Sequence, residues 1–408
     1  MCMEFQVEIV RLDDRGRGIG YLNGKIVFVE DALPQELVRV KMTREKKKYC
    51  EAKVVERLVT SKERVIPECR YYGTCGGCNL MHLSYSKQLE YKKKKGIQLF
   101  QKFAGVELED VEIISSEPFY YRNKVVVHVE HGKMGYYQKE SHQFVEIDHC
   151  LLLHPKINQL FTELKGASFL NSVENIMIRT FQGGLETQIV FYPQENLDHE
   201  EIIHRIKHLV TSIYVDHTCI YGNDEILEKI GDRNYLVRPE SFFQVNTKTT
   251  KKLYDQVKEK LEPSEKDVVL DLYCGAGTIG LYIAPYVKHV YGVEIVKEAV
   301  MSAKKNQEIN RTKNIEFYVG DTKTILEEFH LQANKVIVDP PRSGLDQKTK
   351  EYLLKLVPER IIYVSCDPVT LTRDIKDLSS KYELKTITFV DMFPNTEHVE
   401  SVCLLKRR

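Results

Sequence analysis

The stretch Arg360-Ile-Ile-Tyr-Val-Ser-Cys-Asp-Pro-Val369 carries a short apolar run that ends abruptly. Residues 361–364 are apolar or aromatic and predict a buried strand, which Pro368 cannot continue because proline donates no hydrogen bond to a ladder. Cys366 is therefore presented at a strand end. Ligands bind at this edge in open α/β sheets, so Cys366 stands where a nucleophile would act. The alternative is a small buried hydrophobe, as most isolated cysteines are.

Length, composition and charge set the outer bounds. The 408 residues suffice for two or three domains, and a charged fraction of 29% is ordinary for a globular protein. The formal net charge is zero, so any face that binds nucleic acid must be local. No apolar run approaches the ~20 residues that span a bilayer, and the start lacks a signal-peptide core. We therefore expect a cytoplasmic protein without membrane contact.

From residue 236 onward, strands alternate with helices, which predicts a parallel sheet of the Rossmann-like α/β class. A helix is expected at 247–261. The expected strands are 267–272, 289–293, 315–319, 335–338 and 361–364, with a final hairpin at 386–390 and 401–405. We take 236–408 as the domain that contains Cys366.

Residues at the ends of these strands predict a nucleotide-like cofactor. The loop with Gly275, Gly277 and Gly280 lets a ligand approach the backbone at a helix N-terminus. Glu294 would bind ribose hydroxyls, and Asp321 would contact adenine. This much also fits a dinucleotide. The rigid acidic turn Asp339-Pro-Pro would face the reactive end of the cofactor, and it favours S-adenosylmethionine over a dinucleotide. The competing interpretation, that these acids are helix caps and solvated strand ends, does not explain why four successive strands each end in one.

The first 60 residues read as short strands separated by turn residues, which predicts a small closed barrel of the oligonucleotide-binding type. The expected strands are 4–10, 25–29, 36–42 and 49–59. Residues 39–48 contain six basic side chains and one acid, so they form either a hairpin that follows RNA phosphates or a solvated turn. Because these residues would lie on such a barrel, we favour a hairpin that binds RNA over a solvated turn.

Residues 61–235 are expected to form an α+β domain with a cysteine cluster. Cys69, Cys75 and Cys78 lie close together around paired glycines that allow a tight fold, and Cys150 is the best fourth ligand. A zinc site and a [4Fe-4S] cluster both use four thiolates, so the spacing leaves both open. We expect packing or exposed thiols for the remaining cysteines: Cys2, Cys50, Cys219, Cys274 and Cys403. A strongly basic helix is expected at 84–104, where a solvated surface helix is the simpler interpretation.

Four segments together resemble the bacterial RNA uracil-C5 methyltransferases over essentially the whole chain. The segments are Asp339-Pro-Pro-Arg-Ser-Gly344, Ser365-Cys-Asp-Pro368, His398-Val-Glu400 and Arg238-Pro-Glu-Ser-Phe-Phe-Gln-Val-Asn246. The similar branch has an N-terminal TRAM barrel and a cluster-binding cysteine set, and it mostly modifies 23S ribosomal RNA. Transfer RNA stays open as a substrate. The resemblance also implies that residues 84–115 pack with the catalytic domain.

The resemblance implies roles for individual residues. Cys366 would be the nucleophile and Glu400 the base, with Glu397 a weaker alternative outside the matched motif. The cysteines at 69, 75, 78 and 150 would carry [4Fe-4S]. The residues expected to line S-adenosylmethionine are Gln244, Tyr273, Gly275, Gly277, Thr278, Glu294, Asp321 and Asp339. The family often has Asn where this chain has Thr278.

These residue types suit the chemistry. A thiolate that adds to C6 of uracil makes C5 nucleophilic toward a sulfonium methyl group, and a carboxylate then removes the C5 proton. A stacked base cannot reach such a site, so we expect the nucleotide to be flipped out. The same motifs allow two other functions. One is an exocyclic-amino methyltransferase of the Asp-Pro-Pro type, which would leave Cys366 unexplained. The other is a non-catalytic RNA-binding factor. We expect a monomer without an obligate protein partner.

Overall fold

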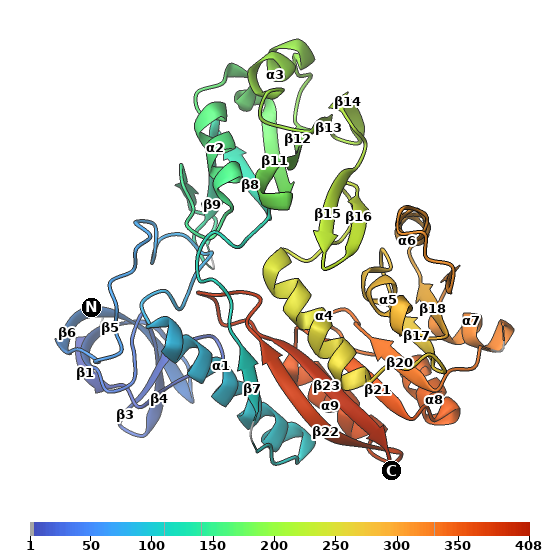
Figure 1. Ribbon diagram of the computed structural model, residues 1–408. Helices are drawn as coiled ribbons and strands as arrows, with labels where there is room; N and C mark the ends of the chain where they lie inside the picture. Colours follow the sequence, from blue (N-terminus) through green and yellow to red (C-terminus); the bar gives the residue numbers. More distant parts are fainter. Residues whose placement is uncertain (1–3, 110, 140, 330) are drawn as a thin grey trace. The chain divides into compact units, whose positions relative to one another are not determined.

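The computed structural model describes residues 4–109, 111–139, 141–329 and 331–408 (Figure 1). Cys2 lies outside the described residues. The chain forms two compact units. The barrel unit comprises the chain up to Lys95, together with Tyr136–Ile147 and Phe393–His398, and the larger unit comprises Gly96–Gly135, Asp148–Met392 and Val399–Arg408. The predicted division at residues 60 and 235 stays a prediction.

The N-terminal strands form the expected closed barrel. They are β1 (Glu4–Glu8), β2 (Arg11–Leu12), β3 (Gly18–Leu22), β4 (Lys25–Glu30), β5 (Leu37–Glu45) and β6 (Tyr49–Val59). Their order is β1-β5-β6-β4-β3-β2. Because β1 and β2 are consecutive on one segment yet end opposite edges of this order, the sheet closes, and the Val10 N–H donates to the Ile19 carbonyl at 2.8 Å. Alternating side chains such as Val27 and Val29 fill the interior.

Helix α1 (Tyr85–Leu99) holds a distant loop instead of lying fully solvated. The Lys92 ammonium, on a fully buried side chain, donates to the Phe393 carbonyl at 3.0 Å, and Lys95 donates to the Glu397 carbonyl at 2.8 Å. Gln88 pairs with Asn395 through two hydrogen bonds of 3.1 and 2.9 Å. The solvated-helix interpretation is therefore wrong on this face of α1. The helix continues as a π-helical turn, η1 (Phe100–Ala104), in the larger unit.

The middle of the chain has the expected α+β character. Its sheet contains β8 (Lys124–Glu130), β9 (Lys133–Tyr137), β11 (Val173–Phe181), β12 (Glu186–Pro193), β13 (Ser212–Val215) and β14 (Thr218–Gly222), with β10 (Phe144–Glu146) at one edge. The helices are α2 (Pro155–Leu164) and α3 (His199–Ile206), with short turns η2 (Ser168–Ser172) and η3 (Gln182–Gly184). The turn η3 separates β11 from β12.

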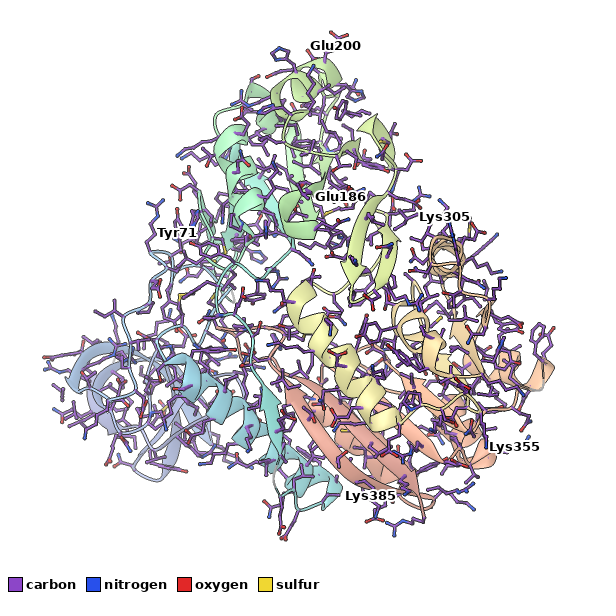
Figure 2. All side chains as sticks on the ribbon, in the orientation of Figure 1. Tyr71, Glu186, Glu200, Lys305, Lys355 and Lys385 are labelled. Carbon is purple, nitrogen blue, oxygen red and sulfur yellow. The ribbon has the colours of Figure 1, made fainter. Side chains whose placement is uncertain are left out.

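A hairpin leads from this sheet to the catalytic one. It comprises β15 (Ile226–Ile230) and β16 (Arg233–Val237). Helix α6 (Lys297–Ile309) holds it from the catalytic side: Lys305, labelled in Figure 2, binds Glu225 at 2.8 Å, and the Asn306 amide oxygen accepts the Leu236 N–H at 2.7 Å. The hairpin also contacts α5 (Thr278–Ile283), where the Tyr235 hydroxyl donates to the Thr278 carbonyl at 3.0 Å, and α4 (Thr247–Leu261), where the Thr247 hydroxyl donates to Glu228 at 2.5 Å.

The catalytic sheet has eight strands in the order β19-β18-β17-β20-β21-β23-β22-β7. The strands are β17 (Val268–Leu272), β18 (His289–Glu294), β19 (Ile315–Val319), β20 (Lys335–Val338), β21 (Arg360–Ser365), β22 (Tyr382–Val390), β23 (Glu400–Arg407) and β7 (Glu112–Ile114). The accompanying helices, besides α6, are α4 (Thr247–Leu261), α5 (Thr278–Ile283), η4 (Ala284–Tyr286), α7 (Thr322–Glu328), α8 (Gln347–Leu356) and α9 (Pro368–Leu378). Strands β17 to β21 are parallel, as expected, and the order switches direction between β17 and β20, where ligands bind in such sheets.

Two strand pairings of this sheet add detail to the sequence expectations for 84–115 and for the final hairpin. Strand β7 pairs in parallel with β22, so the segment 84–115 contributes an edge strand to the catalytic sheet while residues 85–95 of α1 belong to the barrel unit. Strand β23 runs antiparallel between β21 and β22. Across the ranges that the structure describes, no helix is long and apolar enough to cross a bilayer.

A buried carboxylate fastens the barrel to the chain that follows it. Glu36 is fully buried and accepts hydrogen bonds from the Leu33 N–H at 2.9 Å and from two guanidinium nitrogens of Arg64 at 2.6 and 3.0 Å. Burial by itself raises the pKa of Glu36, but the hydrogen bonds and charge of Arg64 and the backbone donors outweigh it, so the pKa is lowered. The ion pair therefore stabilises the fold mainly when Glu36 is ionised.

We predict that Glu36→Gln lowers the free energy of unfolding by about 3 kcal/mol, because the largely buried Arg64 guanidinium loses its buried carboxylate and keeps an ion pair only with the half-exposed Asp31 at 3.1 Å. Since the folded-state pKa is lowered, the loss is fully present above about pH 4.3 and disappears as pH falls through the folded-state pKa. Urea denaturation of the full chain measures both. Glu30→Gln is the control, since its exposed carboxylate pairs with Lys53 only at 3.7 Å. Equal losses in the two variants would contradict the assignment.

Candidate active site

Cys366 lies between the end of a strand and the cap of a helix. Strand β21 ends at Ser365, and α9 begins at Pro368, which occupies a first-turn position where its missing N–H is not needed. The Asp367 carboxylate caps α9 by accepting two first-turn N–H groups at 2.8 and 3.2 Å. The motif Ser-Cys-Asp-Pro is therefore a strand end joined to a capped helix, with a partly buried thiol at the junction.

Glu400 faces Cys366 across two neighbouring strands. Strands β21 and β23 are antiparallel, with Ser365 opposite Ser401. Continuing this register by one residue places Cys366 opposite Glu400, and directly opposed residues lie on the same face of a sheet. The Glu400 side chain is only 5% exposed, and its charge acts on the thiol. The structure thus brings together the two residues that we expect to be catalytic.

The turn after β20 adds two charged groups to this pair. Strand β20 is the other neighbour of β21, and its last residue is followed by Asp339, which is partly buried. Three residues later in the chain, the positive charge of Arg342 acts on the Cys366 thiol and favours the thiolate. We did not assign a role to Arg342 from the sequence. The available signal was its position as the only cation in Asp339-Pro-Pro-Arg-Ser-Gly344.

Burial and like charges raise the pKa values at this cluster. Burial and then the charges of Glu400 and Asp339 raise the pKa of Cys366 to about 11, while Arg342 opposes the shift. Burial and the charge of Asp339 raise the pKa of Glu400 to about 8, and burial raises the pKa of Asp339 to about 7. Two carboxyl groups with pKa values near neutrality can exchange protons with a bound substrate at physiological pH. This arrangement fits a thiol nucleophile with an adjacent base.

The glycine loop between β17 and α5 leaves its backbone open to a ligand. Gly275 and Gly277 have φ values of 53° and 75°, which favour glycine. A Cβ at Gly275 would meet nothing within 4 Å, whereas a Cβ at Gly277 would lie 2.6 Å from Phe317. The Gly280 N–H is held by the buried Asp271 carboxylate at 2.8 Å. The loop is therefore held by Asp271 on one side and is open to a ligand at Gly275.

The acids at the neighbouring strand ends differ in what they hold. The Glu294 carboxylate accepts the N–H groups of Gly275 at 3.1 Å and Val296 at 2.9 Å, so it lies against the glycine loop. Asp321 instead caps α7, accepting the Thr324 N–H at 3.2 Å. The helix-cap interpretation, which we set aside for these acids, therefore holds at Asp321. A cofactor contact of either acid stays a prediction.

The remaining expected cofactor residues have protein partners. The Tyr273 hydroxyl donates to Asp346 at 2.7 Å, and the Thr278 hydroxyl accepts from Tyr254 at 2.7 Å. Gln244 lies on the segment before α4, where its carbonyl accepts from the Asn123 amide at 3.2 Å. Tyr273 immediately follows β17, beside the turn that begins at Asp339. These contacts position the side chains without testing their role in binding.

The four cysteines expected to bind a cluster are divided between the two compact units. Cys69, Cys75 and Cys78 are partly buried in the barrel unit between β6 and α1, whereas Cys150 belongs to the larger unit. Burial raises the pKa of Cys75, the Gly77 N–H lowers it, and nearby Cys69 raises it further. Within the ranges that the structure describes, no three or more His, Cys, Asp or Glu side chains are grouped to hold a metal ion. The ligand set stays a prediction.

Comparison with known proteins agrees with this geometry. Residues 201–408 match the family described as tRNA (uracil-5-)-methyltransferase, and residues 3–55 match the TRAM domain. An uncharacterized RNA methyltransferase of Staphylococcus aureus (strain MSSA476) is 34% identical, covering 97% of this chain and 96% of its own. One of Halalkalibacterium halodurans is also 34% identical, with coverage of 98% and 96%.

A solved structure resembles the whole chain. The tRNA (uracil-54, C5)-methyltransferase of Pyrococcus abyssi, in complex with S-adenosyl-L-homocysteine, superposes with a TM-score of 0.79 at 28% identity, covering 98% of this chain and 100% of that one. The family model covers every strand of the sheet that carries Cys366 and Glu400 except β7, and the TRAM match covers most of the barrel. The chain therefore belongs to the tRNA (uracil-5-)-methyltransferase family and carries a TRAM domain at its N-terminus.

Proposed function

We propose that this protein methylates C5 of a specific uridine in RNA through a transient covalent bond from Cys366 to C6 of the base. The observation that carries the proposal is the register of β21 and β23, which sets Cys366 opposite Glu400 at the carboxyl edge of the catalytic sheet. An exocyclic-amino methyltransferase would need the Asp339 turn but would have no use for a thiol and carboxylate facing each other.

The thiol opens the reaction. Cys366 loses its proton and attacks C6 of uracil, forming the S–C6 bond while the electron pair of the C5=C6 bond moves toward the C4 carbonyl. When bound, S-adenosylmethionine supplies an electrophilic methyl group to C5. Glu400 then removes the C5 proton, the C5=C6 bond re-forms, and the C6–S bond breaks to return the thiolate. The positive charge of Arg342 favours the thiolate at both ends of this sequence.

The pKa values of Cys366, Glu400 and Asp339 suit these proton transfers. The pKa of Cys366, raised to about 11 chiefly by burial, keeps it as a thiol at neutral pH, so a neighbouring base must accept its proton as it attacks. Glu400, with a pKa raised to about 8, and Asp339, with a pKa raised to about 7, lie close enough to neutrality to accept and release protons. We assign Glu400 to the C5 proton because Asp339 stands on the opposite side of β21.

The residues at the first strand ends fit S-adenosylmethionine. The open backbone at Gly275 leaves room for a ligand, and Glu294 beside it has carboxylate lone pairs beyond the two that accept backbone N–H groups. Ribose hydroxyls can donate to those lone pairs. We propose that Gln244, Tyr273, Gly277, Thr278, Asp321 and Asp339 complete the cofactor site.

We propose that the substrate is 23S ribosomal RNA, with transfer RNA as the alternative. The ribosomal preference rests on the resemblance to the branch with a cysteine set. The TRAM match and the β5–β6 turn, where Lys46, Lys47 and Lys48 are all exposed, support contact with RNA phosphates. A flipped uridine is required because Cys366 is partly buried. We also propose a cytoplasmic monomer.

We further propose that the cysteine set carries a [4Fe-4S] cluster. Three thiols within ten residues, two of them close enough for Cys69 to act on the pKa of Cys75, are a donor set suited to iron or zinc. Transfer of a methyl cation needs no electron, so the cluster's role would be structural or in positioning RNA.

We predict that Cys366→Ala lowers turnover by about 10³-fold or more and abolishes the trapped complex with RNA that contains 5-fluorouridine, whose C5 substituent cannot leave as a proton. Glu400→Gln should instead accumulate a covalent protein–RNA species on ordinary RNA, visible on a denaturing gel, because the adduct cannot lose its C5 proton. Glu397→Gln is the matched control and should behave as wild type. A Glu400→Gln variant that turns over normally would refute the base assignment.

We predict that cells lacking the protein lose 5-methyluridine at one or more positions of 23S ribosomal RNA, with transfer RNA unchanged. Mass mapping of both RNA classes, with and without a plasmid-borne copy, measures this. Restoration by the wild type but not by Cys366→Ala ties the loss to the thiol. Loss confined to transfer RNA would move the substrate to that class, and a new exocyclic-amino methylation would overturn the uridine assignment.

We predict that anaerobically purified protein contains about four iron and four sulfide per chain and absorbs broadly in the visible range. Cys75→Ser should remove most of the iron, while Cys219→Ser, a partly buried cysteine elsewhere in the chain, should not. Zinc in place of iron would make a zinc site the preferred assignment over a [4Fe-4S] cluster. The absence of both metals would refute the site.

A further inference from the structure

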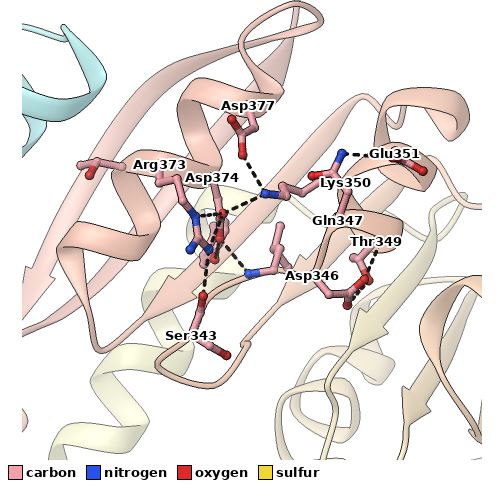
Figure 3. Close-up of polar contacts among 12 residues, drawn as sticks. Ser343, Asp346, Gln347, Thr349, Lys350, Glu351, Arg373, Asp374 and Asp377 are labelled. Carbon is pink, nitrogen blue, oxygen red and sulfur yellow. Dashed lines mark hydrogen bonds and ion pairs between the residues drawn. The ribbon is translucent and has the colours of Figure 1, made fainter.

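A buried carboxylate on α9 connects several elements around the active site. Asp374 is fully buried, and its Oδ2 atom accepts the Tyr363 hydroxyl and the Leu345 N–H, each at 2.7 Å. Its Oδ1 atom accepts two guanidinium nitrogens of Arg373 at 3.0 and 2.8 Å and lies 3.5 Å from the Lys350 ammonium. Figure 3 shows Arg373 and Lys350 meeting at Asp374, with Ser343 of the turn after β20 bound to Arg373.

Three consecutive residues of that turn are held against α9. The Ser343 carbonyl accepts from Arg373 at 2.8 Å, and Leu345 donates its N–H to Asp374. Between them, Gly344 has φ +79°, and a Cβ there would lie 2.4 Å from the Asp374 carboxylate. Only glycine fits this contact without displacing the turn or the helix. The backbone of the turn is therefore fastened to α9 at three successive positions.

The fastened turn and the helix meet at Cys366. The turn begins with Asp339 and carries Arg342, whose positive charge acts on the Cys366 thiol. Helix α9 begins two residues after Cys366. The charged groups that act on the thiol are Glu400 from β23 and Asp339 and Arg342 from the turn, and of these only Arg342 favours the thiolate. The placement of Arg342 depends on how the turn sits on α9.

We propose that Asp374 is a positioning residue that sets Arg342 against the Cys366 thiol by fastening the 339–345 turn to helix α9. The inference deepens the proposed function, since it rests on Cys366 as the nucleophile. A buried carboxylate is a poor way to gain stability alone, because its desolvation offsets much of the attraction to its partners. It does fix geometry, because its two oxygens accept from three elements at once.

The test follows the reactivity of the Cys366 thiolate without RNA. Alkylation of Cys366 by iodoacetamide at about pH 8.5, read by peptide mass spectrometry, has a rate proportional to the thiolate fraction below the thiol pKa. We predict that Asp374→Asn slows this alkylation about tenfold and Arg373→Met about threefold, since a displaced Arg342 raises the pKa of the thiol. The rate of methyl transfer should fall in parallel, with KM for S-adenosylmethionine unchanged.

Asp377→Asn is the matched control. Asp377 lies on the same helix and binds the same Lys350 at 2.7 Å, but its side chain is half-exposed and does not touch the turn. It should leave alkylation at the wild-type rate. Because the Arg373 side chain is also half-exposed, Arg373→Met should fold even if Asp374→Asn does not.

Wild-type alkylation rates in both Asp374→Asn and Arg373→Met, whatever their melting temperatures, would overturn the proposal and leave Asp374 a purely structural residue. Failure of the proposed function has a different signature. It would appear as wild-type protein that forms no adduct and no 5-methyluridine on any RNA, while the variants still slow alkylation.

Discussion

The antiparallel pairing of β23 with β21 is the constraint on which the active site depends. It sets Ser365 against Ser401, and one residue further it sets a thiol against a carboxyl group. Because this pair lies at the buried carboxyl edge of the sheet, burial raises the pKa of both groups, and the charge of Glu400 raises the pKa of the thiol further. A slip of one residue would turn Glu400 to the opposite face.

The sheet is therefore built to hold that register from both sides. Strand β20 runs parallel to β21 and delivers Asp339 and Arg342 to the same edge. Strand β22 pairs with β23 along its whole length, with Val390 opposite Glu400. The cap at Asp367 and the contacts of Asp374 fix the helix that follows Cys366. The reactive thiol is thus positioned by hydrogen bonds that do not involve its own atoms.

The loop that joins β22 to β23 belongs to a different compact unit from the two strands that it connects. Residues Phe393–His398 belong to the barrel unit, while both strands that they connect belong to the larger unit. Within the barrel unit, three side chains of α1 bind this loop through Phe393, Asn395 and Glu397. The basic face of α1 is thereby used in part for main-chain carbonyls, with a buried lysine among them, and not only for solvent or RNA.

Local sequence determined many of the helices and strands and indicated the candidate residues for the chemistry. Apolar runs gave β19, β20 and the helix α4 at the predicted bounds, because side-chain burial in a strand or helix follows a short repeat that each segment carries by itself. The Ser-Cys-Asp-Pro and Asp-Pro-Pro motifs identified Cys366 and Asp339 because proline and capping residues act within a few positions. The glycine loop was visible for the same reason.

Only the tertiary structure decided which strand ends meet. Four features join residues from separate segments of the chain. They are the pairing of β23 with β21, the pairing of β7 with β22, the action of the Arg342 charge on Cys366 and the contacts that meet at Asp374. Asp321 illustrates the limit, since its sequence position suited a cofactor contact equally well as the helix cap that it forms. Register and side-chain partners depend on long-range packing, and no local repeat records them.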